Sequence, residues 1–190
     1  SPLVYDTTMT SSVRTYAVAN QGNVISPFIV AGAMSPVTQP GIIAQAHAEV
    51  LVGIALTQLV NPGAPVVYGS FLTIMNLKSG APTFGTPEST QACLAISQLC
   101  RRMGLPFRCG GQLTASKTAD GQAMAESVNS MNPAILAGAN FVFQAAGWLE
   151  GGLRIGYEKF VMDCDQLGAI ERMARGLDVT TDQLGARLTR

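Results

Sequence analysis

Four β–α units follow one another along this chain and limit the folds open to it. Short β-branched or aromatic runs begin near residues 24, 65, 106 and 140, and each is followed by a segment with helical periodicity. Strands and helices that alternate in this way form a parallel sheet through right-handed crossovers. The 190 residues are about half of what an eightfold (β/α) barrel of the TIM type needs. Long loops after every strand favour half a barrel over a four-stranded doubly wound sheet, because all strand ends of a barrel meet at one active face.

Cap and stop signals mark the ends of these units. Asp6, Thr86 and Asp120 stand where helix N-caps are expected, because each precedes a helical segment and carries an oxygen that accepts from a free backbone N–H. Gly69 ends the second strand, and a long loop with 78–85 in its middle is expected after it; loops of such length are usually functional. We expect strands at 24–31, 65–68, 105–107 and 140–144, and helices after Asp6 and at 41–60, 87–103, 120–136, 159–175 and 181–187.

The chain is poor in charge for a solitary domain. Only 13% of its residues are charged, against about 25% in typical soluble domains. We therefore expect some faces to be buried against another part of the protein or against a second subunit. The segment 41–60 is nearly long enough to span a membrane, but Gln45, His47 and Glu49 interrupt it. A buried amphipathic helix is the favoured interpretation, and no membrane is expected as a partner.

Charge and cysteine usage limit the partners and the location. The formal net charge is zero, and no basic cluster exceeds Arg101-Arg102, so nucleic acid is not an expected partner. The four cysteines lack a C-x-x-C spacing, and with one histidine a zinc site within the chain is not expected. Reduced thiols and the lack of a recognisable signal peptide favour a cytoplasmic location.

Aromatic side chains and one lysine lie close to the predicted strand ends. Tyr68, Phe71, Trp148 and Tyr157 fall just beyond strands or in loops. Rings turned into one pocket would hold a cation without hydrogen-bond donors, such as a quaternary ammonium. The alternative is that two or three of these rings only pack the top of the barrel. Lys117 is a Schiff-base nucleophile if it is desolvated, a receptor for a substrate carboxylate, or a solvated surface lysine.

Other conspicuous positions have plain structural explanations. Gly110-Gly111 matches neither a P-loop nor G-x-G-x-x-G, so close packing at a strand end is expected rather than an anion nest. Glu158 opens the last helix, where the helix dipole favours a carboxylate. His47 is expected to make a structural hydrogen bond, and Asp163 to belong to a polar helix face.

Several stretches together carry a family resemblance. They are PFIVAGAMSP at 27–36, NPGAPVVYG at 61–69, SGAPTFGTPE at 79–88, GGQLTASK at 110–117, AAGWL at 145–149 and YEK at 157–159. In this order they resemble the corrinoid-dependent trimethylamine methyltransferase family over nearly the whole chain. Members of that family are similar to a complete barrel and more than twice as long. The resemblance implies that residues 1–190 are a single partial barrel domain, roughly the C-terminal half of the barrel.

The resemblance also implies a chemistry. Family members transfer a methyl group from a methylated amine to the cobalt of a separate corrinoid protein docked over the barrel mouth. The methyl carbon is electrophilic only when its nitrogen is a good leaving group, a condition that a quaternary ammonium meets unaided. Members that use trimethylamine carry pyrrolysine, whereas every residue here is one of the standard twenty. The chain is therefore similar to the members without pyrrolysine, some of which demethylate glycine betaine.

On this resemblance the protein acts by positioning. It desolvates the cation against aromatic rings and aligns the methyl group with cobalt, while Lys117 or Arg154 takes up the carboxylate of a betaine. No catalytic residue and no metal ligand is assigned. The candidate substrate-binding residues are Tyr68, Phe71, Lys117, Trp148, Tyr157 and Glu158, and the candidates for contact with the corrinoid are Gly110, Gly111 and Gln112.

Two other functions remain open at this point. One is a lysine-dependent aldolase or lyase on the same barrel, with Lys117 forming the imine. The other is a non-catalytic assembly module. Half a barrel exposes two sheet edges, so we expect a homo-oligomer, in which two halves can close into one barrel.

Overall fold

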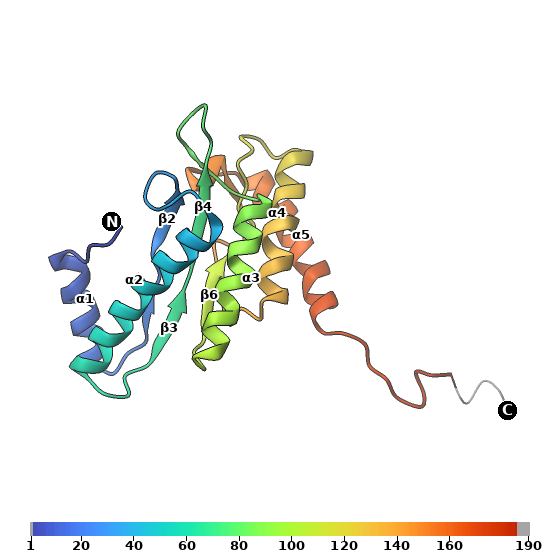
Figure 1. The fold of residues 1–190 in the computed structure, drawn as a ribbon. Helices are drawn as coiled ribbons and strands as arrows, with labels where there is room; N and C mark the ends of the chain where they lie inside the picture. The colour runs from blue at the N-terminus through green and yellow to red at the C-terminus, as the bar shows by residue number, and fades with distance from the viewer. Residues whose placement is uncertain (1, 186–190) are drawn as a thin grey trace.

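The computed structural model describes residues 2–185 as a parallel sheet with helices packed on it (Figure 1). The four strands of the parallel sheet lie in the order in which they occur in the sequence, and a three-stranded and a two-stranded sheet accompany it. The alternation of strands and helices expected from the sequence is confirmed. The sheet strands are β1 (Asn23–Ile25), β3 (Val66–Gly69), β6 (Phe107–Gly110) and β7 (Phe141–Phe143), and the helices are α1 (Thr7–Val18), α2 (Gln39–Val60), α3 (Pro87–Arg102), α4 (Gly121–Leu136) and α5 (Tyr157–Ala174).

The helix starts follow the predicted caps. The side chain of Asp6 accepts a hydrogen bond from the backbone N–H of Met9 at the start of α1. Thr86 accepts from Ser89 N, and Asp120 accepts from Ala123 N, at the starts of α3 and α4. Each of these caps satisfies a backbone donor that has no partner inside its helix.

Two strands stand in the structure where each of the first two predicted strands was expected to begin. A break at Pro27 divides the first into β1 and β2 (Phe28–Ala31), because proline has no N–H for the ladder. The expectation of one long loop after Gly69 is wrong. The chain resumes after Ser70 as β4 (Phe71–Met75), which pairs in parallel with β2 and antiparallel with β5 (Pro82–Thr83). The β-branched and aromatic residues of β4 suit a strand, and the pairing with β2 stabilises it.

Two further strands follow β7, and the described residues after α5, 175–185, contain no helix. Trp148–Leu149 (β8) and Arg154–Ile155 (β9) pair antiparallel around a short 3-10 turn, Glu150–Gly152. The prediction of a helix at 181–187 is wrong for residues 181–185, which form turns. Residues 186–187 lie outside the described residues.

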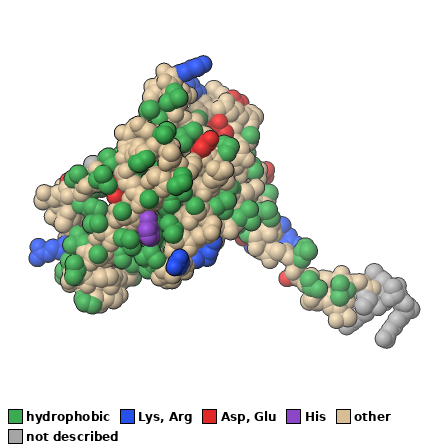
Figure 2. Space-filling view, in the orientation of Figure 1, with side chains coloured by type: hydrophobic (Ala, Val, Ile, Leu, Met, Phe, Trp, Pro, Cys, Tyr) green, Lys and Arg blue, Asp and Glu red, His purple; other side chains and the backbone are tan. Residues whose placement is uncertain are grey.

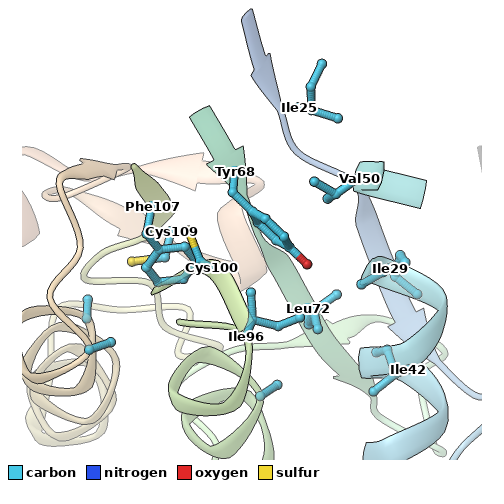
Figure 3. Packing of buried hydrophobic residues seen from close by; sticks show 14 of the residues in the cluster. Ile25, Ile29, Ile42, Val50, Tyr68, Leu72, Ile96, Cys100, Phe107 and Cys109 are labelled. Carbon is cyan, nitrogen blue, oxygen red and sulfur yellow. The ribbon is translucent and has the colours of Figure 1, made fainter. Parts of the chain in front are cut away.

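The hydrophobic core lies between the sheet and α2, α3 and α4. Figure 3 shows the ring of Tyr68 among Val50, Leu72 and Ile96, with Phe107 on the neighbouring strand. All five side chains are buried. Side chains alternate along a strand. The strand residues next to Tyr68, Leu72 and Phe107 therefore point to the opposite face of the sheet, which we call the open face.

Helix α2 has one buried and one exposed side. Within the described residues it is the one helix long and apolar enough to cross a membrane, which by itself is weak evidence, because core helices pass the same test. Its exposed side carries Leu51, Val52 and Leu59, and Figure 2 shows few charged side chains on the helical side of the molecule. The low charge of the sequence is thus visible at the surface. The buried residues of α2 are Ile42, Ala46, Glu49, Val50, Gly53 and Thr57.

Candidate functional site

The open face of the sheet holds a hollow of about 350 Å³. Strand alternation places its residues there, since Phe107 and Cys109 of β6 point into the core and Arg108 between them points away. We call this space the Arg108 hollow. Its lining residues are Val24, Ser26, Phe28, Phe71, Arg108, Phe143 and Gln144.

The guanidinium of Arg108 lies at the centre of the hollow. Nη1 donates to Oγ of Ser26 at 3.0 Å, and Nη2 donates to Oε1 of Gln144 at 3.2 Å. The rings of Phe71 and Phe143 lie 5.6 Å and 4.7 Å from the guanidinium carbon. These are cation–π distances, so the charged group is fixed from three neighbouring parts of the sheet.

Arg108 is a buried cation without an acidic partner in the described part of the chain. Its exposed fraction is 7%, none of the four ion pairs within residues 2–185 involves it, and its Nε has no hydrogen-bond partner there. Burial lowers the pKa of the Arg108 guanidinium from its usual value, yet an arginine stays charged in proteins. A buried charge of this kind is costly unless it is paired, so the hollow suits an anionic group.

Aromatic rings surround that charge. Phe28 packs against Phe71 with ring centroids 5.4 Å apart, and Phe71 packs against Phe84 at 5.3 Å. The ring of Phe143 lies over the same guanidinium, and Phe141, which packs on Phe143 edge to face at 4.6 Å, does not line the hollow. The hollow therefore combines one cation, which attracts an anion, with ring faces, which attract a second cation. A zwitterion with a carboxylate and an ammonium group matches both features.

The predicted substrate residues do not all lie at this hollow. Phe71 lines it. Tyr68 points to the opposite face, has no exposed surface, and shares a 3.0 Å hydrogen bond with Nδ1 of His47; burial raises the pKa of the Tyr68 hydroxyl. The structural hydrogen bond expected for His47 is confirmed.

Lys117 lies on the surface in a small charged cluster. Its side chain is 77% exposed, and its Nζ is 3.9 Å from Oε1 of Glu150. Glu150 Oε2 in turn pairs with Nε of Arg154 at 2.7 Å. A Schiff-base lysine is activated by desolvation or by a neighbouring cation, and the exposure of Lys117 provides little desolvation. The two basic residues proposed as carboxylate receptors are already paired to Glu150.

Trp148, Tyr157 and Glu158 lie beyond β7, around the start of α5. Trp148 is partly buried in β8, opposite Ile155. Tyr157 is 89% exposed, and Glu158 is an exposed residue in the first turn of α5. None of the three is among the residues that line the Arg108 hollow.

The glycine pair after β6 packs against protein. A Cβ on Gly111 would lie 2.9 Å from Cα of Ala145, and one on Gly110 would lie 3.1 Å from the ring of Phe71. Gln112 has no exposed surface. The close approaches explain why glycine stands at both positions, and the contact of these three residues with a corrinoid stays a prediction. The close packing expected for the pair is confirmed.

Sequence reasoning missed Arg108, Phe143 and Gln144. The signal was present in part, because Phe107, Arg108 and Cys109 alternate between apolar, charged and apolar at a predicted strand. The sequence did not show which of these side chains face the core and which face the opposite side of the sheet. The prediction that Asp163 lies on a polar helix face is wrong. Asp163 has no exposed surface and is ion-paired with Lys159.

Replacing Tyr68 by phenylalanine tests whether this residue binds substrate. We expect the free energy of unfolding to fall by about 1 kcal/mol, because one buried hydrogen bond is lost, while the KM of the full-length protein for its substrate stays unchanged. Urea denaturation and steady-state kinetics measure the two quantities. A raised KM at unchanged stability would return Tyr68 to the substrate site.

Comparison with known proteins identifies a family and relatives of the chain. Residues 1–189 match the family described as trimethylamine methyltransferase (MTTB). The chain is 39% identical over 182 residues to glycine betaine methyltransferase of Desulfitobacterium hafniense (strain Y51), covering 96% of this chain and 38% of that protein.

Two further relatives have comparable sequence identity to the chain. Proline betaine:corrinoid methyltransferase of Eubacterium limosum is 33% identical over 180 residues, covering 95% of this chain and 37% of that protein. Trimethylamine methyltransferase of Methanosarcina barkeri is 36% identical over 162 residues, covering 85% and 32%. The chain thus spans between a third and two fifths of the length of these curated relatives.

Proposed function

Since the chain belongs to the trimethylamine methyltransferase family, we propose that it is part of an enzyme that removes a methyl group from a carboxylate-bearing quaternary amine. We propose further that residues 1–190 form one partial (β/α) barrel domain, about half of a barrel, whose inner surface is the open face. The parallel strand order and the one-sided helix layer support this. The four free cysteines of the described chain support a cytoplasmic protein.

The observation that carries the substrate class is the unpaired guanidinium of Arg108 among aromatic rings. A betaine places a carboxylate and a quaternary ammonium a few bonds apart. With the carboxylate on Arg108, the ammonium lies against neighbouring rings such as Phe28. Trimethylamine has no group for Arg108, and binding it would leave the buried charge unpaired. The names of two relatives, which act on glycine betaine and proline betaine, agree with this choice.

The protein's contribution is to bind, orient and dehydrate the substrate. Pairing with Arg108 fixes the carboxylate end, so that the methyl groups point out of the hollow. The ring faces exclude water from the ammonium. The reaction needs no proton transfer, because the quaternary nitrogen leaves with the electron pair of the broken C–N bond. The methyl acceptor is the cobalt of a corrinoid carried by a partner protein, which supplies the nucleophile.

A substrate panel tests this function with the full-length protein. Glycine betaine and proline betaine carry a carboxylate, whereas choline, an equally quaternary amine, and trimethylamine do not. With free cob(I)alamin as acceptor, we expect demethylation of a betaine, measured by mass spectrometry of the amine product, at more than tenfold the rate for choline. Equal rates for choline or faster loss of methyl from trimethylamine would contradict the proposal.

Replacing Phe28 by leucine tests the aromatic side of the hollow. Cation–π contacts contribute about 0.5 to 2 kcal/mol, so KM for the betaine should rise by about 2- to 30-fold in steady-state kinetics. Phe141→Leu is the matched control, because Phe141 is on the same face and is similarly exposed, at 46% against 42%, but does not line the hollow. Equal effects of the two changes would remove Phe28 from the substrate site.

A further inference from the structure

A fully buried ion pair connects α5 with α4. Nζ of Lys159 donates to Oδ2 of Asp163 and, at 2.7 Å, to Oγ of Ser127 on α4. Neither charged side chain has any exposed surface. Removing two ions from water costs several kcal/mol for each, and such pairs often stabilise a fold no more than apolar residues of the same volume. Fold stability alone does not explain why this pair is present.

The second partner of Asp163 belongs to the segment after β7. The backbone N–H of Gly147 donates to Oδ2 of Asp163 at 2.8 Å. Gly147 has φ +86°, and a Cβ there would lie 3.2 Å from Ile155 and 3.3 Å from Phe160. Only glycine takes up this conformation in so close a space. The pair therefore holds a backbone turn as well as two helices.

Gln112 holds the same segment from the other side. With its amide oriented so that the nitrogen donates, Gln112 donates to the carbonyl of Ala145 at 2.6 Å and to the backbone carbonyl of Asp163 at 3.2 Å. The loop after β6, the loop after β7 and α5 thus meet in one hydrogen-bonded cluster. The cluster consists of Gln112, Ala145, Gly147, Lys159 and Asp163, with Ser127 at its edge.

Directly before this cluster stands Gln144, which orients Arg108. Gln144 has φ +51°, a region that costs a residue with a Cβ about 1 kcal/mol or more and persists only where the surroundings hold it. Its Oε1 accepts from Nη2 of Arg108. A backbone in this state would relax if Ala145 and Gly147 were released.

We propose that the Lys159–Asp163 ion pair is a positioning unit for substrate recognition, which fixes residues 145–147 and thereby keeps Gln144 beside the guanidinium of Arg108. The inference rests on the proposed function for the role of Arg108. Asp163 and Lys159 touch no substrate; they act through the backbone of Gly147. The buried Oδ1 of Asp163, which has no partner among the described residues, agrees with a site that is not optimised for stability alone.

Asp163→Asn in the full-length protein tests this role. Hydrogen exchange of the peptide that contains Gly147, followed by mass spectrometry, should be about tenfold faster, because the charge-assisted hydrogen bond is weakened. KM for the betaine should rise about fivefold or more while kcat changes less. Glu171→Gln removes an exposed ion pair on the same helix and should leave exchange at Gly147 and KM unchanged.

A double variant separates positioning from folding. Lys159→Met with Asp163→Leu removes both charges and leaves no unpaired buried ion, so the fold should persist; Gly147 still loses its acceptor. Fast exchange confined to residues 143–148 together with a raised KM supports the proposal. Unchanged exchange at Gly147, or faster exchange spread over the whole chain with unchanged KM, overturns it. Failure of the unaltered protein to demethylate any betaine instead overturns the proposed function, which exchange rates do not measure.

Discussion

Replacing Arg108 by methionine should lower kcat/KM for a betaine by about 30-fold or more. Removing one partner of a desolvated charge pair costs about 2 to 5 kcal/mol, and the change leaves the substrate carboxylate without its cation. Steady-state demethylation kinetics with glycine betaine and proline betaine measure the loss. The side chain of Arg108 is already bound to Ser26 and Gln144 and stacked by two rings, so lysine, with its single charged nitrogen, should not restore the rate.

Arg154→Met is the matched control for this experiment. Arg154 is 70% exposed and paired with Glu150, and it was the carboxylate receptor expected from the sequence together with Lys117. If Arg154→Met or Lys117→Met lowers kcat/KM as much as Arg108→Met does, the carboxylate is bound at the charged surface cluster. A similar loss with choline, which has no carboxylate, would mean that Arg108 supports the fold of the site without contacting substrate.

Replacing Lys159 alone by methionine should reduce the free energy of unfolding by about 3 to 5 kcal/mol, the range for a buried ion left without its partner. Asp163 would then remain buried with the N–H of Gly147 as its one side-chain partner among the described residues. Urea denaturation of the full-length protein measures the change. Most of the loss should be recovered when Asp163 is replaced by leucine as well.

The control for this stability loss lies on the same helix. Arg175→Gln breaks the Glu171–Arg175 pair, which has the same i,i+4 spacing but is 69% and 65% exposed. Exposed pairs contribute about 0 to 1 kcal/mol, so the expected change is small. If Lys159→Met were equally mild, the buried pair would be neutralised or hydrated in the folded protein, and its role as a fixed anchor for Gly147 would be excluded.

The helices could be predicted because their signals are local. Asp6, Thr86 and Asp120 cap the helices they were expected to cap, since the donor and the acceptor of each cap lie three residues apart. The strand β4 was missed for the opposite reason. Its stability comes from pairing with β2, some 43 residues earlier in the register Phe28↔Phe71, and no local signal reports such a partner.

Only the types of residue in the candidate site, and not their positions, could be predicted from the sequence. Aromatic residues and a cation-binding pocket were expected, and the structure brings Phe71 together with Phe28, Phe143 and Arg108. Tyr68 and Lys117 were expected beside them. Tyr68 lies instead in the core with His47, and Lys117 lies on the surface. Spacing along the chain gives a residue's distance from a strand end; it does not give the face to which the side chain points.

By itself the sequence determined the order of β–α units, the helix caps and, through residues spread over nearly the whole chain, the family. Tertiary structure alone decided which side of β6 faces the helices, and hence that Arg108 is buried without an acidic partner among residues 2–185 while Phe107 and Cys109 fill the core. The physical reason is that caps and periodicity depend on neighbours a few residues away. The environment of a charge depends on segments that are far apart in the sequence. Ser26 and Gln144, which contact Arg108, lie 82 and 36 residues from it along the chain.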